Sequence, residues 1–396
     1  MQPQACDPSK NMKYRLGSLL LLVIGSELQA NELYGSWYWH AFASQTVIHT
    51  TDNNFAGKSD DNLSADSREL GLLIGGAPLP NLSLAGQLLS RNAGAIDDGR
   101  IRLDYGYANY TLYSGLNWMT SIRGGRVRTP YGFYNETRDV AHTRTSILLP
   151  QGVYVDRFRN LDFTRDGLQW LGNYQFDMSS LSWDVAVGEI RIKEKDASEV
   201  VQDPDGKVTG SVDTPWVPIA RVIWDWDMGR IRLGLTYNPL EYRYSAAPLD
   251  SFNSGTLKIR NWVVSAEYNA ANWSLIGEYN HEDMDMGALM GKAAPGVSFE
   301  NQTRGYYLQG IYRFDLRWDA FLRYDTRRIS FKEVSELDSS TKDITLGIGW
   351  KPDEHWLIRA EWHIVDGAYW LSVQENRAED LKRHWQMALF QVSYRI

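Results

Sequence analysis

The chain has 396 residues, a formal net charge of −8 and 43% hydrophobic residues. This negative balance argues against a nucleic acid partner, because binding phosphates needs a basic surface. No run of 18 apolar residues occurs after Ala30, which excludes transmembrane helices but not membrane-spanning strands, in which only alternate residues are apolar. The 16 Trp and 22 Tyr residues favour membrane–water boundaries, and several, such as Trp273 and Trp318, are expected to form aromatic girdles.

The first 30 residues are predicted to be a leader. A basic start, a short apolar run and a small-residue cleavage site at Ala30 are the parts of a secretory signal peptide over 12–30. The polar stretch 1–11 before it is interpreted as an over-extended start or a tag, and it contains the single cysteine, Cys6. Residues 31–396 are then expected to be one domain without cysteine.

Most of this domain alternates between apolar and polar residues with a period of two, the pattern of strands with one apolar face. Sixteen strands are predicted, at 34–44, 67–76, 80–90, 101–112, 116–128, 163–176, 180–192, 215–226, 230–240, 256–269, 272–283, 302–313, 316–329, 341–350, 355–366 and 385–396. Because the second face stays polar, these strands fit an all-β, transmembrane antiparallel β-barrel with water inside and lipid outside.

The predicted connections alternate in length along the chain. Seven short turns are expected, near 77–80, 113–116, 177–180, 227–229, 270–272, 314–316 and 351–354. Eight longer connections fall between them, near 45–66, 91–100, 129–162, 193–214, 241–255, 284–301, 330–340 and 367–384. An even-stranded barrel with both chain ends in the periplasm requires this alternation, with short periplasmic turns and long extracellular loops.

Two hairpins predict specific strand registers. A turn at 228–229 would place Asp225 opposite Arg232 and Trp224 opposite Leu233, so that charges share one face and apolar residues the other.

The second hairpin leaves an alternative open. A turn at 114–115 would place Tyr107 opposite Ile122 on the lipid face. Arg126 and Arg128 would then face outward at the rim, where they could bind lipopolysaccharide phosphates, unless a bulge at the preceding glycine pair turns them inward.

The last strand, 385–396, carries an end signal. Every second residue from Ile396 back to Ala388 is apolar, and Tyr394 is aromatic. This ending resembles the closing strand of bacterial outer-membrane barrels, which carry an aromatic residue third from the end; Ile396 departs from their terminal Phe or Trp. In strand number, loop alternation and end signal, the whole domain resembles the sixteen-stranded porins of Gram-negative bacteria.

This resemblance implies location in the outer membrane, assembly as a homotrimer, and contacts with outer-membrane lipid and lipopolysaccharide. It also implies that barrel-insertion machinery recognises 385–396. No cofactor or metal is expected, since the cluster from His281 to Asp285 lacks a full ligand set.

The longest connection, 129–162, holds the candidate constriction. Its apolar run 147–149 and its aromatic residues suit a loop that packs inside the barrel, as the third loop does in the porins that the chain resembles. The candidate constriction residues are Glu136, Arg138, Asp139, Arg144, Asp156, Arg157 and Arg159. The alternative is that these charges only pair locally to hold the loop, as Glu136 with Arg138 or Asp156 with Arg159 would.

Charged residues on inward faces of strands form the candidate pore wall: Arg102, Asp104, Arg123, Asp225, Arg230, Arg232 and Arg323. Fixed charges in a pore select ions, and the arginines favour anionic or zwitterionic solutes. The sequence therefore predicts a passive diffusion channel for small hydrophilic solutes or ions.

Three other classes compete with the channel. A non-conducting barrel for adhesion or assembly would need no inward loop. An outer-membrane hydrolase is disfavoured because the chain has no GxSxG, no HExxH and no compact His/Ser pair. A soluble binding domain is disfavoured by the leader and the end signal.

Overall fold

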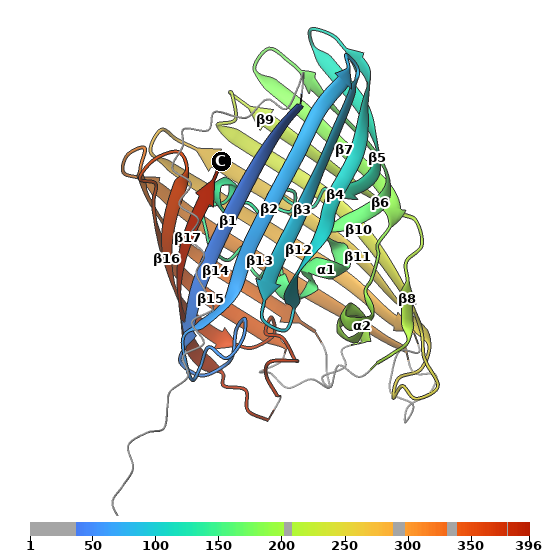
Figure 1. Cartoon of the computed structure of the whole chain (residues 1–396), viewed down its shortest axis with the longest axis vertical. Helices are drawn as coiled ribbons and strands as arrows, with labels where there is room; N and C mark the ends of the chain where they lie inside the picture. The colour runs from blue at the N-terminus through green and yellow to red at the C-terminus, as the bar shows by residue number, and fades with distance from the viewer. Residues whose placement is uncertain (1–36, 202–207, 288–297, 331–338, 378) are drawn as a thin grey trace, which may run out of the picture.

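The computed structural model describes residues 37–201, 208–287, 298–330, 339–377 and 379–396. The predicted leader, 1–30, and most of two predicted loops (288–297 and 331–338) lie outside these residues. The described residues form a single closed antiparallel barrel with strongly tilted strands (Figure 1). None of its helices is long and apolar enough to span a membrane.

Each strand except β8 is hydrogen-bonded to the next strand of the barrel, β8 pairs with β10, and β1 pairs with β17, which closes the barrel. The strands are β1 (Trp37–Thr50), β2 (Ser64–Leu79), β3 (Leu82–Ala93), β4 (Asp97–Ser114), β5 (Trp118–Arg128), β6 (Thr164–Gln175), β7 (Ser179–Glu189), β8 (Ser211–Asp213), β9 (Val217–Trp226), β10 (Ile231–Ser245), β11 (Gly255–Asn269), β12 (Trp273–Gly287), β13 (Ser298–Arg313), β14 (Trp318–Ile329), β15 (Ser340–Trp350), β16 (Trp356–Gly367) and β17 (His384–Arg395). Because β8 and β9 both pair with β10, they occupy one position, and the barrel has the sixteen strands that were predicted.

Seven short connections lie at one end of the barrel, the short-turn end: 80–81, 115–117, 176–178, 227–230, 270–272, 314–317 and 351–355. The other end, the long-loop end, carries the longer connections. One predicted long connection is wrong, because β3 and β4 extend towards each other and leave only 94–96 between them. Gly94, with a positive φ of 55°, makes this tight turn possible.

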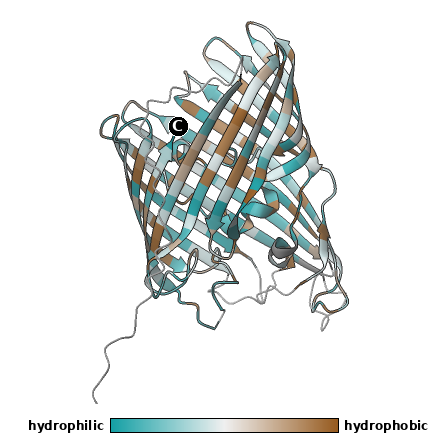
Figure 2. Ribbon diagram, in the orientation of Figure 1, coloured by the Kyte–Doolittle hydropathy of each residue, from teal (hydrophilic) through white to brown (hydrophobic). Residues whose placement is uncertain are grey.

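The outer surface of the barrel is an apolar belt. Hydrophobic and hydrophilic residues alternate along the strands that form it (Figure 2). Leu322 is 58% exposed and Phe390 49% exposed, with further large apolar side chains on every neighbouring strand. Aromatic residues flank the belt near both ends of the strands: Trp273, Tyr312, Trp318 and Trp350 near the short turns, and Trp262, Tyr279, Tyr306 and Tyr324 towards the long loops. An exposed apolar surface of this extent, bordered by aromatic rings, is the surface of a membrane-spanning barrel.

The register predicted for the hairpin of β9 and β10 is confirmed. Asp225 lies opposite Arg232, and Trp224 lies opposite Leu233. The backbone turns through positive φ values at 227–229, ending in Gly229, where the φ of 83° suits a residue without Cβ.

The register predicted for β4 and β5 is wrong. Tyr107 lies opposite Gly125, because the turn is longer than predicted, with Ser114 paired to Met119, and β4 has a bulge against β5 beyond Tyr113. A second bulge of β4, against β3, changes which residues of the strand face the interior. Tyr107 faces the interior, beneath the guanidinium of Arg123, whose Cζ is 4.6 Å from the ring centre.

The two arginines at the end of β5 separate. No register shift occurs at the glycine pair, so Arg126 stays on the outer face and pairs with Asp166 at 2.7 Å. Arg128, the last residue of the strand, turns inward towards Gln87 and Asp104.

Candidate pore constriction

The connection 129–163, called loop 3 below, lies inside the barrel. It contains the short helices η1 (Ala141–Thr143), η2 (Asp156–Phe158) and α1 (Arg159–Asp162). Its apolar side chains are buried against the inner wall, with Leu149 3% and Tyr154 2% exposed. These residues pack with inward apolar residues of β11 to β14, which explains why this loop is rich in aliphatic and aromatic residues.

Three carboxylates of the wall hold the backbone of loop 3. Glu278 of β12 accepts hydrogen bonds from the Phe133 amide (3.0 Å) and from the Tyr154 hydroxyl (2.6 Å). Asp325 of β14 accepts one from the Gly152 amide (2.6 Å).

The third carboxylate is Glu361 of β16, which accepts hydrogen bonds from the amides of Ile147 and Leu148. Buried amides need such partners, so these contacts fix the path of the loop across the lumen.

Two glycines permit the closest contact between loop 3 and the wall. A Cβ built on Gly305 of β13 would lie 1.8 Å from the carbonyl oxygen of Gly152. A Cβ on Gly152 would lie 2.7 Å from the carbonyl oxygen of Thr326. Neither position can carry a side chain while the loop keeps this path.

Six of the seven candidate constriction residues are largely buried between loop 3 and the wall. Arg138 contacts Asp156 at 3.3 Å, and Asp156 also pairs with Arg91 of β3 at 2.5 Å. Arg159 pairs with Asp139 at 2.6 Å and with Asp104 of β4 at 3.4 Å.

The remaining two buried candidates also reach other segments. Arg144 pairs with Glu69 of β2 at 3.3 Å, and Arg157 donates to the carbonyl of Leu371 at 3.0 Å. The loop charges do pair locally, but as Arg138 with Asp156 and Arg159 with Asp139 rather than in the two combinations given as examples. They also pair with the wall residues Glu69, Arg91 and Asp104, which the loop sequence alone does not reveal.

Glu136 is the candidate that borders open space. It pairs at 2.5 Å with Arg221 of β9, which is also 3.6 Å from Asp184 of β7. Sequence reasoning missed both wall residues, although Arg221 is an even number of residues from the inward Asp225, a signal that could have identified it.

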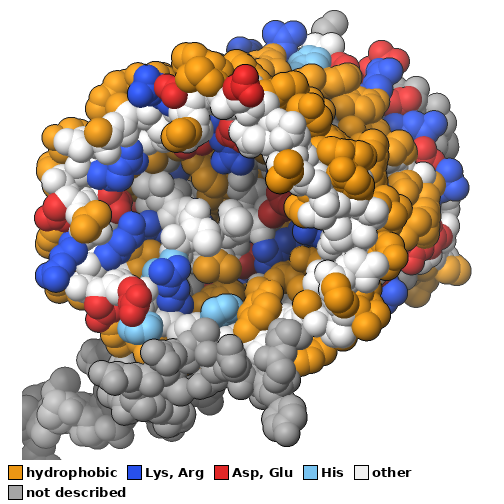
Figure 3. All heavy atoms as spheres, turned by 90° about the horizontal axis from the view of Figure 1, so that it is seen from above, with side chains coloured by type: hydrophobic (Ala, Val, Ile, Leu, Met, Phe, Trp, Pro, Cys, Tyr) orange, Lys and Arg blue, Asp and Glu red, His pale blue; other side chains and the backbone are white. Residues whose placement is uncertain are grey.

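Two cavities lie beside Glu136, with volumes of about 260 and 450 Å³. Figure 3 looks into the end where the C-terminus lies and shows the barrel hollowed there, with basic and acidic side chains inside. The charged residues lining the two cavities are Arg123, Arg221, Arg232, Arg313, Glu136, Asp184 and Glu267.

The candidate wall residues have unequal access to the lumen. Arg123 and Arg232 line the cavities, and Arg232 lies over the ring of Phe133 at 4.8 Å. Arg323 is only 1% exposed, because loop 3 covers it and Leu148 accepts its hydrogen bond at 3.1 Å.

The other wall candidates form pairs near the ends of strands. Arg102 bonds Asp97 at 2.6 Å, and Asp225 contacts Arg232 at 3.4 Å. Arg230 belongs to the turn 227–230 and pairs with Asp227, so the prediction that it lies on a strand of the wall is corrected.

Burial and charge shift the pKa values of loop 3 residues. The pKa of His142 is lowered to about 4, mainly by burial and in smaller part by the nearby cation of Arg395. Burial also lowers the pKa of Arg138 to about 10, against the opposing effect of Asp156. For Asp139 burial opposes ionisation, but Arg159 and other arginines prevail and lower its pKa to about 2.

Within the described ranges, no group of three or more His, Cys, Asp or Glu residues could hold a metal ion. The weak candidate from His281 to Asp285 belongs to β12 rather than wholly to a loop. Alternate residues there point to opposite faces, and the intervening Glu282 pairs inward with Arg327 at 2.5 Å.

No protein-family model and no curated protein sequence matches the chain. Solved structures do match. The chain has the fold of the outer-membrane porins.

The anion-selective porin from Comamonas acidovorans aligns with a TM-score of 0.56 and 13% identity, over 91% of this chain and 99% of that one. Salmonella typhi OmpF in complex with daunomycin aligns with a TM-score of 0.57 and 13% identity, over 92% and 100%. The trimer form of OmpT, an outer membrane protein of Vibrio cholerae, aligns with a TM-score of 0.57 and 12% identity, over 91% and 99%. This shared fold and the apolar belt place the chain in the outer membrane of a Gram-negative bacterium.

Proposed function

We propose that the protein is a passive channel for small hydrophilic solutes, with a preference for anions, and that it is not an enzyme. The observation that carries this proposal is the charged lumen beside loop 3, where four arginines and three carboxylates line cavities of about 260 and 450 Å³. A lumen with fixed charge admits water and sorts solutes by charge and size.

The preference for anions follows from how these charges are paired. Arg123 bonds only the neutral side chains of Asn109 and Gln169, and Arg313 bonds Ser274 and a carbonyl group. Neither has a carboxylate partner among the described residues. Their positive potential therefore reaches into the lumen, while the charge of Glu136 is met by Arg221.

Among the seven loop candidates, we assign Glu136 to contact with solute and the other six to holding the loop. The burial of those six supports this division. The constriction then lies between Glu136 and the wall formed by β5, β7 and β9.

The proposal extends to processing and assembly. Residues 12–30 act as a signal peptide, 385–396 is recognised by the insertion machinery, and three copies assemble in contact with lipid and lipopolysaccharide. The fold shared with a trimeric relative supports the last point. The outward ion pairs of Asp166 with Arg126 and Arg191 offer cations that suit lipopolysaccharide phosphates.

Swelling of proteoliposomes tests conduction directly. Vesicles containing the refolded barrel are transferred into isosmotic solutions of neutral, anionic and cationic solutes of matched size. The proposal predicts swelling with all three, fastest with the anion. Vesicles that hold folded barrel but swell no faster than protein-free vesicles would contradict it.

One observation favours the second candidate, a non-conducting barrel. Two connections at the long-loop end, 51–63 and 368–383, are pinned to each other. Asn376 accepts a hydrogen bond from the Asn54 amide, and Glu375 accepts one from the Gly57 amide, each at 2.8 Å. If these two connections close the lumen, vesicles with the wild-type protein do not swell, and Glu375→Ala makes them swell. If the channel is open, the same substitution leaves the swelling rate unaltered.

A further inference from the structure

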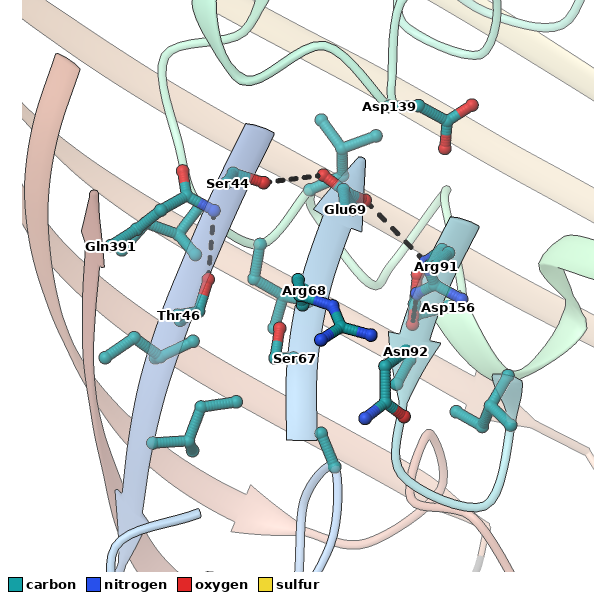
Figure 4. Close-up of a pocket in the computed structure, with 18 of the residues that line it drawn as sticks. Ser44, Thr46, Ser67, Arg68, Glu69, Arg91, Asn92, Asp139, Asp156 and Gln391 are labelled. Carbon is teal, nitrogen blue, oxygen red and sulfur yellow. Dashed lines mark hydrogen bonds and ion pairs between the residues drawn. The ribbon is translucent and has the colours of Figure 1, made fainter. Parts of the chain in front are cut away.

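A further, smaller chamber lies between loop 3 and the wall formed by β1, β2 and β3. Its volume is about 50 Å³. Figure 4 shows Glu69 of β2 between Ser44 of β1 and Arg91 of β3, with Asp156 of loop 3 also against Arg91. The chamber is thus bounded by charged side chains on both the loop and the wall.

The buried charges around the chamber do not cancel. Its buried arginines are Arg91, Arg138, Arg144 and Arg159, and its carboxylates are Glu69, Asp139 and Asp156. At the edge, Asp97 is shared by Arg102 (2.6 Å) and Arg91 (3.7 Å), and Asp104 is shared by Arg128 (3.5 Å) and Arg159 (3.4 Å), so these two carboxylates offset the two further arginines. One arginine charge is left in excess among the buried lining residues, since the fifth lining arginine, Arg68, is exposed. An uncompensated buried charge is strongly unfavourable.

Two arginine nitrogens at the chamber lack a hydrogen-bond partner in the described part of the chain. They are Nη1 of Arg91, from the wall, which lies 3.7 Å from Oδ2 of Asp97 without a hydrogen bond, and Nε of Arg144, from loop 3. The two side chains are 7% and 9% exposed, so bulk water does not satisfy them. Oδ2 of Asp139 also lacks a donor there, which a water molecule in the same space would supply.

The chamber limits the size of a ligand. A volume of about 50 Å³ is room for roughly four water molecules. This admits a halide or an oxyanion of a few atoms together with water, and it excludes sugar acids and nucleotides.

We propose that this chamber binds one small monovalent anion, such as chloride, between Arg91 and Arg144, and that the bound anion fastens loop 3 to the wall. The site differs from the open lumen, since neither arginine lines the cavities beside Glu136. The inference does not depend on conduction.

The test is thermal unfolding of the full folded barrel in detergent, titrated with sodium chloride while sodium gluconate keeps the ionic strength constant. Gluconate is too large for the chamber. The proposal predicts a saturable rise of the unfolding temperature, of roughly 3–6 °C once chloride is far above its dissociation constant. A response that is absent, or linear without saturation, would overturn it.

Three variants separate the site from general effects of charge. Arg138→Gln removes the excess charge and should abolish the chloride response, while Glu69→Gln increases the excess and should lower the half-saturating chloride concentration about tenfold. Arg232→Gln makes the same charge change in the open lumen and should keep the wild-type response. If Arg138→Gln and Arg232→Gln respond alike, or Glu69→Gln weakens the response, the chamber is not the site. The Glu69→Gln result decides the question even if Arg138→Gln fails to fold.

Discussion

Single arginines at the edge of loop 3 differ in function because their partners differ. Arg159 is enclosed by Asp139 and Asp104, whereas the hydrogen-bond partners of Arg123 among the described residues are side-chain amides, and Arg123 lines the lumen. A buried ion costs several kcal/mol unless it is paired, so the enclosed arginines mainly hold structure. Arg123, which lines the lumen, can attract an anion that passes through the channel.

His142 should make the attachment of loop 3 to the turn 351–355 sensitive to pH. Its ring bonds the carbonyl of His355 at 3.1 Å, and the nearby charged groups are the cations Arg359, Arg395 and Lys351. Its pKa of about 4 in the folded loop lies below the usual 6.5, so a detached loop binds more protons between these values. The attachment is therefore at full strength above pH 6.5 and weakens as the pH falls towards 4.

Hydrogen exchange over 137–145 can measure this effect. Protection of the backbone amides, relative to their intrinsic exchange rates, should fall between pH 7 and pH 5 in the wild type. It should stay constant in His142→Gln, because glutamine keeps a polar side chain that does not titrate. Equal pH profiles in the two proteins would rule out His142 as the origin.

At the scale of elements, period-two alternation was enough to predict sixteen strands. The position of one tight turn, at 228–229, was enough to predict the pairing of Asp225 with Arg232. Bulges were not predictable, because they insert one residue without disturbing the apolar pattern on either side. The bulges in β4 moved Tyr107 from the expected lipid face to the interior. The short connection 94–96 was missed because polar residues such as Asp97 continue the strands beyond the belt.

The contact between loop 3 and β13 predicts a strong difference between two glycines of that strand. Gly305→Ala places a methyl group where the carbonyl of Gly152 lies, so the loop must shift, at a cost of about 1–3 kcal/mol in the free energy of unfolding. Gly310→Ala is the matched control, since no atom lies within 4 Å of its added Cβ. Unfolding in denaturant should distinguish the two variants, and equal stabilities would show that loop 3 does not press on β13.

At the scale of the whole molecule, the inward loop could be anticipated from its composition, but its partners could not. Glu69 and Arg91 meet loop 3 only because the barrel curves their strands around it. Glu278 and Glu361 are likewise ordinary polar positions in their strands until the loop's amides reach them. The sequence was therefore enough to identify the candidate residues, but not to predict which of them hold the loop and which face the lumen.

Deleting 138–150 should raise the conductance of the barrel. The segment carries Leu148 and Leu149 across the lumen, and its removal opens that space while the strands keep their hydrogen bonds. The measurement is single-channel conductance of the deletion variant against wild type, with circular dichroism to show that the barrel is intact. Unchanged conductance would mean that loop 3 is not the constriction.

The central claim is a water-filled channel whose unpaired arginines favour anions. The most direct test is the current through single refolded barrels in a planar bilayer, with a salt gradient across it to give a reversal potential. The account predicts steady openings and a reversal potential with the sign of anion selectivity. Folded barrels that never open would contradict the channel itself, and a reversal potential of the opposite sign would contradict the role given to Arg123 and Arg313.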